Sequence, residues 1–576
     1  MKKKSLTIKT YLSSLFKEVG GKFIQIRTNL ISLQGLRVLL FLTFLQGLGV
    51  LLFSCKDTVS PTIVVVKNDE TYSPDKVRLV LNEWQRKNFS FFYEGASPTG
   101  LALEGNERGD VVTTGGTGFG LMALIVGAER GFISREQAAS QTKKIVQFLG
   151  KAERFKGIWS HWYNPDGTAC PFGDQVKTGD VIETSFLMAG LLTAYEYYLQ
   201  NNSVEKEIRD SVASFRNTVN WKFYTNSQEV LYWLWYSQEN RFALQIKGWN
   251  EGLISYILAL GAPEPNNIST DTYRDSWLRS GGIVKNNRKF YGYTLPLGED
   301  YGGPLFFAHY SFLGLNPGKM KDNYVYYWQQ NVAHTLINRH YCIYEAPKNF
   351  KYTETDWGLT ACYGGRPPWN YSARSPLNDD GVIAPTAAMS SFPYTPFYST
   401  QMLLKLAEYS LAHGTYGFAD AYSPETSTSE KKHLAIDQGP IVVMMENYRS
   451  GLIWNLLMKN EDIQRGLSLA GISTQPEFDE GFHKAITNTY TKQYDMMRHP
   501  DRESFELDFF VKTAGNTKFR FLNSSGETAL DTTILANKGE NIFSFKNSKT
   551  LINPKQYMIK MTTSDLKDYS LVVRLR

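Results

Sequence analysis

Acidic side chains lie beside tryptophan, tyrosine and glycine in several segments of this chain of 576 residues. Carboxylates and amides bind pairs of hydroxyl groups, and aromatic rings present flat apolar faces on which sugar rings stack. Cleavage of a glycosidic bond requires two carboxyl groups, one as an acid and one as a base or nucleophile. The residues of this kind are Glu104, Glu107, Arg108, Asp110, His161, Trp162, Asp180, Glu183, Trp249, Glu251, His309, Tyr310, Asp356, Trp357, Asp379, Asp380, Asp437 and Gln438. Together they have the composition of a glycosidase site.

Glu183 has the surroundings expected of a catalytic acid. An acidic residue at the start of a helix more often caps the helix, and Asp180 followed by Glu183 has that form. However, Glu183 is flanked by Val181, Ile182 and Phe186, and burial among such residues raises the pKa of a carboxyl group. Both roles are therefore open for Glu183. Likewise, Trp249 and Trp357 fit a hydrophobic core as well as a sugar-stacking surface.

The sequence contains no motif for a metal or a nucleotide cofactor. It has no HxxxH or CxxC pair, and its eight histidines are scattered. The glycine-rich segment Gly115–Gly118 precedes a predicted helix, but no lysine follows it and no strand clearly precedes it. A P-loop and a dinucleotide-binding fold are therefore excluded. We expect no cofactor.

The net charge of +6 belongs to the N-terminal region. Residues 1–54 contain eight basic residues and one acidic residue, whereas residues 55–576 contain 54 basic and 55 acidic residues. The net charge of this larger part is −1, so charge gives no support for a nucleic-acid partner.

The N-terminal residues resemble a bacterial lipoprotein signal. Lysines 2–4 precede an apolar run over 38–53 and the segment LFSC, which ends at Cys55. In such signals the cysteine is lipidated and becomes the mature N-terminus. We expect an outer-membrane lipoprotein, facing the periplasm or the cell surface, that contacts the membrane only through this anchor. An uncleaved N-terminal membrane anchor is the alternative.

Helical periodicity predicts about twelve helices in roughly 390 residues. The predicted ranges are 77–93, 118–130, 134–150, 182–200, 204–221, 251–260, 270–280, 320–339, 395–412 and 439–458. Long loops at 97–116, 157–179 and 355–385 separate some of them, and loops of that length are usually functional. Helix pairs of about 30 residues predict a mainly α fold, an (α/α)6 barrel.

The C-terminal part has a different pattern. Short, partly alternating segments at 505–511, 517–522, 541–545, 556–561 and 570–575 are separated by turn residues and predict strands. We therefore expect four regions: a signal peptide at 1–54, a linker at 55–76, a helical catalytic domain at 77–473 and a small β-sandwich-like domain at 485–576. Its strands identify no ligand.

Long segments resemble the bacterial glucoamylase-like family of glycoside hydrolases, which includes β-1,2-glucanases and sophorose-releasing exo-enzymes. The segments, in family order, are VVTTGGTGFGLMALIVGAERGFISREQ (111–137), GDVIETSFLMAGLLTAYEYY (179–198), GWNEGLISYILALGAP (248–263), GGPLFFAHYSFLGLNP (302–317), DWGLTACYGG (356–365), NDDGVIAPTAAMSSFPYTP (378–396) and LAIDQGPIVVMMENYRSGLIWNLLM (434–458). The resemblance implies an (α/α)6 barrel and hydrolysis of a β-linked glucan, most simply β-1,2, with inversion and without a cofactor.

The resemblance also suggests roles for individual residues. Glu183 is the first choice for the general acid, and Asp380 and Asp110 are the candidates for the base. The loop LALEGNERGD, which contains Asp110, departs most from the family pattern. Sugar binding is assigned to Glu107, Arg108, His161, Trp162, Asp180, Trp249, Glu251, His309, Tyr310, Asp356, Trp357, Asp379 and Gln438.

Two other functions remain open at this level. A non-catalytic glycan-binding lipoprotein would bind sugar without turnover. A polysaccharide lyase on the same type of barrel would gather Arg and Lys around a uronate, whereas these loops are acidic and aromatic. The expected partner is a glucan or an oligosaccharide, and we expect a monomer.

Overall fold

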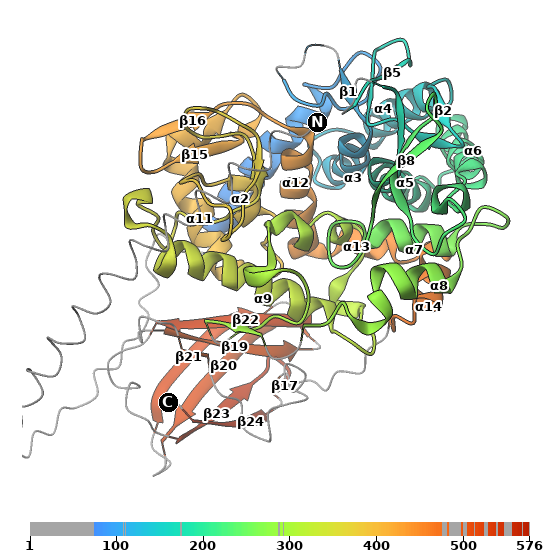
Figure 1. The fold of residues 1–576 in the computed structure, drawn as a ribbon. Helices are drawn as coiled ribbons and strands as arrows, with labels where there is room; N and C mark the ends of the chain where they lie inside the picture. Colours follow the sequence, from blue (N-terminus) through green and yellow to red (C-terminus); the bar gives the residue numbers. More distant parts are fainter. Residues whose placement is uncertain are drawn as a thin grey trace, which may run out of the picture. The chain divides into compact units, whose positions relative to one another are not determined.

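The computed structural model describes most of residues 74–474 and much of the C-terminal part (Figure 1). The described residues are 74–474, apart from 107, 108, 110, 173–175, 286, 287 and 292, and then 481–482, 497–498, 504–511, 513–523, 528–536, 539–546, 556–566 and 568–574. The predicted signal peptide, the lipidation site Cys55 and nearly all of the predicted linker lie outside these residues.

The fold is mainly helical. The α-helices are α2 (Pro74–Tyr93), α3 (Thr114–Glu129), α4 (Arg135–Leu149), α5 (Val181–Tyr197), α6 (Ser203–Thr218), α7 (Leu253–Gly261), α8 (Thr270–Thr272), α9 (Tyr327–His340), α10 (Pro385–Met389), α11 (Pro396–Glu408), α12 (Ala435–Ser450), α13 (Leu452–Leu457) and α14 (Glu461–Leu469).

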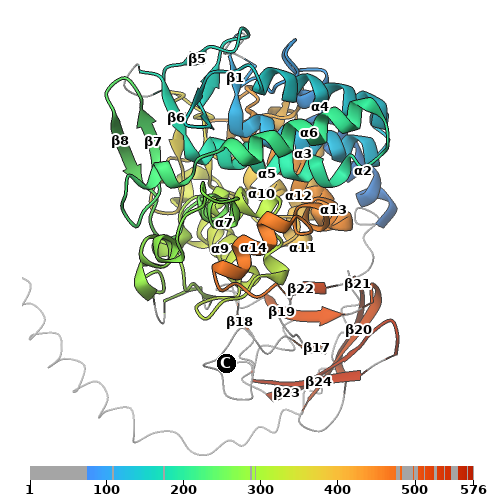
Figure 2. The same cartoon turned by 90° about the vertical axis from the view of Figure 1, so that its right-hand side faces the viewer.

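Two kinds of helix alternate along the first half of the fold. Helices α3, α5 and α7 are buried on all sides, because residues 114–127, 181–194 and 253–261 are all buried. Helices α4 and α6 between them are amphipathic; α6, for example, buries Ile208, Val212 and Phe215 on one face. The buried helices therefore form an inner layer, and α4 packs against α6 outside it (Figure 2).

Glycines allow the inner helices α3 and α5 to approach closely. A Cβ atom on Gly118 would overlap the backbone carbonyl of Phe186, and one on Gly190 would overlap the carbonyl of Gly118. Helix α12 packs against the same α3 and also against α2. The close approach of α3 to α5 brings the N-terminal ends of these two helices together, at the candidate active site.

The predicted helix ranges agree with the structure except at a few places. The predicted helix 320–339 begins only at Tyr327, the start of α9. The predicted helix 439–458 begins earlier, at Ala435, and is divided into α12 and α13 by Gly451, whose φ of +68° ends the first of them. The predicted helix 270–280 is only the short α8 followed by a π-helical turn. Helices α10 and α14 were not predicted.

Small sheets line the connections between helices. One contains β1 (Val112–Thr113), β4 (Trp162–Tyr163) and β5 (Ala169–Cys170), and another contains β6 (Thr178–Asp180), β7 (Tyr232–Tyr236) and β8 (Arg241–Gln245). Antiparallel pairs are formed by β2 (Arg154–Phe155) with β3 (Ile158–Trp159), β9 (Lys289–Phe290) with β10 (Tyr293–Thr294), β11 (Ala361–Cys362) with β12 (Ser372–Ala373), β13 (His413–Gly414) with β14 (Gly417–Phe418), and β15 (Ala421–Ser423) with β16 (Thr428–Glu430).

The C-terminal part forms two antiparallel sheets. The first contains β17 (Gly481–Phe482), β19 (Ser504–Val511), β18 (Met497–Arg498) and β22 (Gly539–Lys546), and the second has the order β21 (Thr528–Ala536), β20 (Gly515–Leu522), β23 (Gln556–Thr562) and β24 (Asp568–Arg574). The rings of Phe509 and Phe519, from the two sheets, pack edge to face. Five of these strands were predicted, whereas β17, β18 and β21 were not.

Two further findings concern the described residues alone. None of their helices combines the length and apolarity needed to cross a bilayer. Cys170, Cys342 and Cys362 are free thiols, the last two buried.

Candidate active site

Glu183 lies in the first turn of α5 and is buried, with 6% of its surface exposed. Asp180 caps this helix, because its Oδ1 accepts a hydrogen bond of 3.0 Å from the backbone N–H of Glu183. The Gly115 N–H, at the start of α3, donates to Glu183 Oε2 at 2.8 Å. The N-terminal ends of α3 and α5 thus hold the carboxyl group of Glu183 between them.

His161 completes this arrangement. Its Nδ1 lies 2.9 Å from Asp180 Oδ2, and its Nε2 lies 4.0 Å from Glu183 Oε1. Burial alone would lower the pKa of His161, but Glu183 and Asp180 raise it to about 9. Burial raises the pKa of Glu183 to about 7, against the opposing effect of His161. Near pH 7 the site therefore contains an imidazolium beside a carboxyl group that still carries its proton about half of the time.

Tyr310 lies among further carboxyl groups. Its ring packs against Phe119, Phe186 and Phe306. Burial raises the pKa of its hydroxyl, and so do its neighbours Tyr371, Asp437, Glu251 and Glu183. These residues come from separate segments of the chain and meet around one hydroxyl group. Burial also raises the pKa of Glu251 to about 7.

A buried pair of carboxyl groups, Asp420 and Asp437, adjoins this cluster. Each is 1% exposed. Asp420 Oδ2 accepts a hydrogen bond of 2.7 Å from the Tyr363 N–H, whereas neither Asp437 oxygen has a partner among the described residues. Burial and mutual repulsion raise the pKa of Asp437, and burial raises that of Asp420 to about 7. Asp437 was assigned no role from the sequence, and Asp420 was missed, although Phe418 and Tyr422 lie two residues to either side of it.

The candidate base Asp380 forms an ion pair. Arg374 Nε donates to Asp380 Oδ1 at 2.6 Å, and Arg374 Nη2 donates to Oδ2 at 3.0 Å. The Asp380 side chain is 54% exposed, whereas that of Arg374 is 2% exposed. Asp380 is therefore an accessible carboxylate with a fixed orientation. The other candidate base, Asp110, lies outside the described residues together with Glu107 and Arg108.

Both predicted tryptophan platforms lie in the core, which corrects the expectation that they stack on sugar. Trp357 is completely buried, and Trp249 is 8% exposed and packs against Trp277, Phe312 and Tyr327. Neither ring presents a face to a ligand. Trp162 is partly exposed and contacts His161 edge to face, beside the Glu183 site.

Four other predicted binding residues have structural partners. Asp356 is 5% exposed, pairs with Lys405 and accepts from the Tyr422 hydroxyl. The remaining three are partnered as follows: Asp379 with the Tyr352 hydroxyl and the Gly381 N–H, His309 with the Ser391 hydroxyl, and Gln438 with the Phe418 carbonyl. Burial lowers the pKa of His309 to about 3, so this imidazole is neutral. These contacts favour positioning of the loops over direct contact with a sugar.

Two exposed aromatic residues were missed by the sequence reasoning. Trp369 is 38% exposed and Tyr371 is 46% exposed. Burial of the Tyr371 hydroxyl and the charges of Asp437, Asp420 and Glu104 raise its pKa. The only signal in the sequence was the spacing W-N-Y after two prolines.

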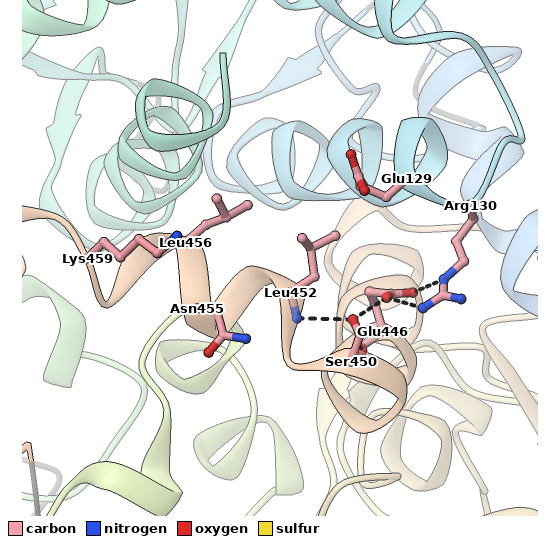
Figure 3. A pocket seen from close by; sticks show the side chains of 8 residues that line it. All are labelled: Glu129, Arg130, Glu446, Ser450, Leu452, Asn455, Leu456 and Lys459. Atoms are coloured by element: carbon pink, nitrogen blue, oxygen red, sulfur yellow. Dashed lines mark hydrogen bonds and ion pairs between the residues drawn. The ribbon is translucent and has the colours of Figure 1, made fainter. Parts of the chain in front are cut away.

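A separate cavity of about 310 Å³ lies at the other end of α3 (Figure 3). It is lined by Glu129, Arg130, Glu446, Ser450, Leu452, Asn455, Leu456 and Lys459. At 1.5 Å per residue, α3 separates it from Gly115 by about 20 Å. Arg130 and Glu446 form an ion pair within it, with 2.6 Å from Nε to Oε2. It takes no part in the carboxyl cluster.

The described residues contain no group of three or more His, Cys, Asp or Glu side chains arranged to hold a metal ion. Within the cluster, backbone N–H groups donate to Glu183 and to Asp420, and Asp180 bonds to His161. The arrangement is suited to proton transfer.

Comparison with known proteins places this site in a family. Residues 243–461 match the family model described as "Putative glucoamylase". A Parabacteroides distasonis protein, named exo β-1,2-glucooligosaccharide sophorohydrolase (non-reducing end), is 39% identical over 418 residues. The match covers 67% of this chain and spans 57% of the length of that protein.

Solved structures agree with this match. The endo-β-1,2-glucanase from Chitinophaga pinensis, in a complex with sophorotriose and glucose, is 43% identical with a TM-score of 0.65; the match covers 69% of this chain and 98% of that one. For a β-1,2-glucanase from Parabacteroides distasonis the identity is 37% and the TM-score 0.64, with coverage of 69% and 60%. Because the match includes nearly all of a relative that is 43% identical, this chain belongs to the glucoamylase-like family.

Proposed function

We propose that this protein hydrolyses a β-linked glucan, most simply β-1,2-glucan or its oligosaccharides, with inversion at the anomeric carbon. One observation carries the proposal: the buried carboxyl group of Glu183, whose pKa is raised to about 7, lies in a cluster of carboxyl and tyrosine groups. The relatives named as β-1,2-glucanases and as a sophorohydrolase support the substrate class.

Glu183 is the proposed general acid. Its Oε2 accepts from the Gly115 N–H, so the proton is carried by Oε1, the oxygen nearer to His161. Donation of this proton to the glycosidic oxygen breaks the bond and leaves a carboxylate on Glu183. The imidazolium of His161, held by Asp180, then lies beside the new negative charge and stabilises it. The departing sugar keeps the proton.

The proposed base removes a proton from the attacking water, directly or through a relay. Asp380 and Asp110 remain the candidates. Asp380 is accessible, and Arg374 supplies a permanent counter-charge, which suits a group that must act as an anion. Asp420 and Asp437 suit this role less well, because burial favours their protonated forms. In inverting enzymes the two carboxyl groups lie about 6.5–9.5 Å apart, which leaves room for the water.

The finer architecture belongs to the same proposal. The alternation of buried and amphipathic helices supports an (α/α)6 barrel with the cluster at one end, and a separate C-terminal β domain. The proposed lipid anchor at Cys55 is tested by labelling cells with radioactive palmitate. Label should enter the wild-type chain and be absent from Cys55→Ala; equal labelling would rule the anchor out.

Product analysis tests the reaction. Purified protein is incubated with defined β-1,2-, β-1,3-, β-1,4- and α-1,4-glucans, and the anomer of the first product is recorded. We expect release of sugar from β-1,2-glucan with the α-anomer first. Binding without release would instead favour a glycan-binding protein, and an unsaturated product absorbing in the ultraviolet would favour a lyase.

Glu183→Gln tests the acid, and Glu205→Gln is its matched control. Glu205 occupies the same position in α6, where its N–H donates to the side chain of the capping residue Asn202, but it pairs with Arg135. We expect Glu183→Gln to lower kcat by roughly 10²- to 10⁴-fold. Glu205→Gln should keep kcat even where it lowers stability. Full activity in Glu183→Gln would refute the assignment.

A further inference from the structure

A β-hairpin with an aromatic tip projects next to the carboxyl cluster. Strands β11 and β12 pair antiparallel, with Cys362 opposite Ser372, so residues 363–371 form the connection between them. This connection, the hairpin tip, contains Trp369 and Tyr371, both exposed. Exposed aromatic rings on one loop offer flat apolar faces to a ligand.

Arg374 holds the hairpin tip in place from beneath. The guanidinium is buried and donates to the carbonyl of Cys362 at 2.6 Å and to that of Asn370 at 3.3 Å, in addition to its ion pair with Asp380. The bonds join the beginning and the end of the tip through one rigid group. The exposed rings are therefore presented on an anchored loop.

The backbone at Trp369 is strained. Its φ of +62° is unfavourable for a residue with a large side chain. Strained residues persist where the surrounding structure holds them, and they occur preferentially at binding and catalytic sites.

The tip adjoins the proposed reaction centre. Tyr363, at its beginning, donates its N–H to Asp420 and contacts the ring of Tyr371. The Tyr371 hydroxyl lies within electrostatic range of Asp437 and Glu104, and it also influences Tyr310, which adjoins Glu183. A glucan bound with its scissile bond at Glu183 would extend from the carboxyl cluster to the hairpin tip.

We propose that the hairpin tip is a sugar-binding subsite of the same active site, in which the Trp369 ring stacks on a glucosyl unit remote from the scissile bond and the Tyr371 hydroxyl bonds to a sugar hydroxyl. The ligand class is a neutral β-linked glucan chain of several units, and the inference rests on the proposed function. Arg374 is a positioning residue for this subsite, because it acts through the tip.

Steady-state kinetics on β-1,2-glucan of defined length test the subsite. Removal of the Trp369 ring weakens binding of a unit remote from the broken bond, so we expect Trp369→Ala to raise KM roughly tenfold for a long chain, with kcat changed less than about twofold. For the shortest substrate that is cleaved, KM should change less. Trp369→Tyr, which keeps a ring, should restore most of the affinity.

Leu377→Ala is the matched control, because Leu377 is 60% exposed just after β12 and has no ring. Its KM should equal that of the wild type. Equal KM values in Trp369→Ala and Leu377→Ala, with a wild-type enzyme that cleaves the glucan, would overturn the subsite and leave the proposed function intact.

A binding measurement separates failure of the proposed subsite from failure of the proposed function. In the Glu183→Gln background, calorimetric titration with β-1,2-glucan oligosaccharides reports affinity without turnover. We expect the additional Trp369→Ala change to weaken binding roughly tenfold. If the wild-type protein releases no sugar, the proposed function fails, and this titration still decides the subsite. Unchanged affinity would then refute it, and weakened affinity would support a glycan-binding role.

Discussion

At the scale of single residues, the environment rather than the residue type separates Glu183 from other glutamates at helix starts. Glu183 and Glu205 occupy equivalent capped positions, but Glu205 accepts from Arg135, whereas Glu183 faces a backbone N–H and an imidazole. Burial lifts the pKa of Glu183 to about 7, while Arg135 and the other donors outweigh burial and lower that of Glu205. The same local motif thus yields a protonated acid in one helix and a structural anion in the other.

The pH dependence of the reaction follows from this difference. A general acid works only in its protonated form, so kcat/KM should fall as the pH rises above about 7, the pKa of Glu183. The pH profile of kcat/KM is measured on β-1,2-glucan over about five pH units, from pH 4 to pH 9. A rate that keeps rising through pH 8 would contradict the assignment of Glu183 as the acid.

The substitution His161→Gln should move the falling, high-pH limb of the kcat/KM profile. The imidazolium favours the ionised form of Glu183 and thereby lowers its pKa. Its removal should raise that pKa and shift the falling limb to higher pH by about one unit, together with a lower maximal rate. His413→Gln is the control, because His413 bonds to the Leu406 carbonyl, and it should leave the limb in place. A shift to lower pH would disprove the electrostatic role.

Part of this site was predictable from neighbouring residues. The apolar residues around Glu183 indicated its burial, and Asp180 was recognisable as a cap. The contacts of His161 with Asp180 and Glu183 were not predictable from the sequence, because they depend on the pairing of β1 with β4 and of β6 with β7. The burial of Trp249 and Trp357 was equally inaccessible, since a tryptophan near a carboxylate has the same local pattern in a core and in a cleft.

At the scale of elements, the helices were predicted more accurately than their interruptions. A buried helix such as α3 shows its type through length and composition alone. The break at Gly451 was missed, although Arg449 in the last turn of α12 and the glycine that follows Ser450 are signals of a helix end. Helix α14, with two acidic residues in its first turn and a capping Asn460, carried a start signal that was overlooked.

Glu446→Ala tests how the C-terminal ends of α3 and α12 are held together. Glu446 is buried and pairs with Arg130, which is 25% exposed, across these two helices (Figure 3). Removal of one partner leaves the other without compensation, so the free energy of unfolding should fall by about 3–5 kcal/mol. Urea denaturation measures it.

Glu83→Ala is the matched control for that change. Glu83 pairs with Lys87 one turn away on the exposed face of α2. Such a pair contributes about 0.3–0.5 kcal/mol, so the midpoint of unfolding should hardly move. Equal effects of the two substitutions would show that the buried pair contributes nothing beyond an exposed one.

At the scale of the whole molecule, the region after residue 54 is close to neutral, with a net charge of −1. A neutral polysaccharide bound by hydrogen bonds and stacking releases no counter-ions. We therefore expect KM for β-1,2-glucan to change less than about twofold between roughly 0.05 and 0.5 M NaCl. A steep loss of affinity with salt would indicate a charged substrate instead.

The side chain of Asp180 links the folding of the chain to its chemistry. One carboxylate oxygen of Asp180 caps helix α5, and the other bonds to His161. Glu183 can therefore act as the proton donor only when this helix begins directly after Asp180. A chain in which the first turn of α5 has unwound would lose the capping bond, the imidazolium contact and the raised pKa of Glu183 together. Recovery of catalysis during refolding would thus report the closure of a single helical turn.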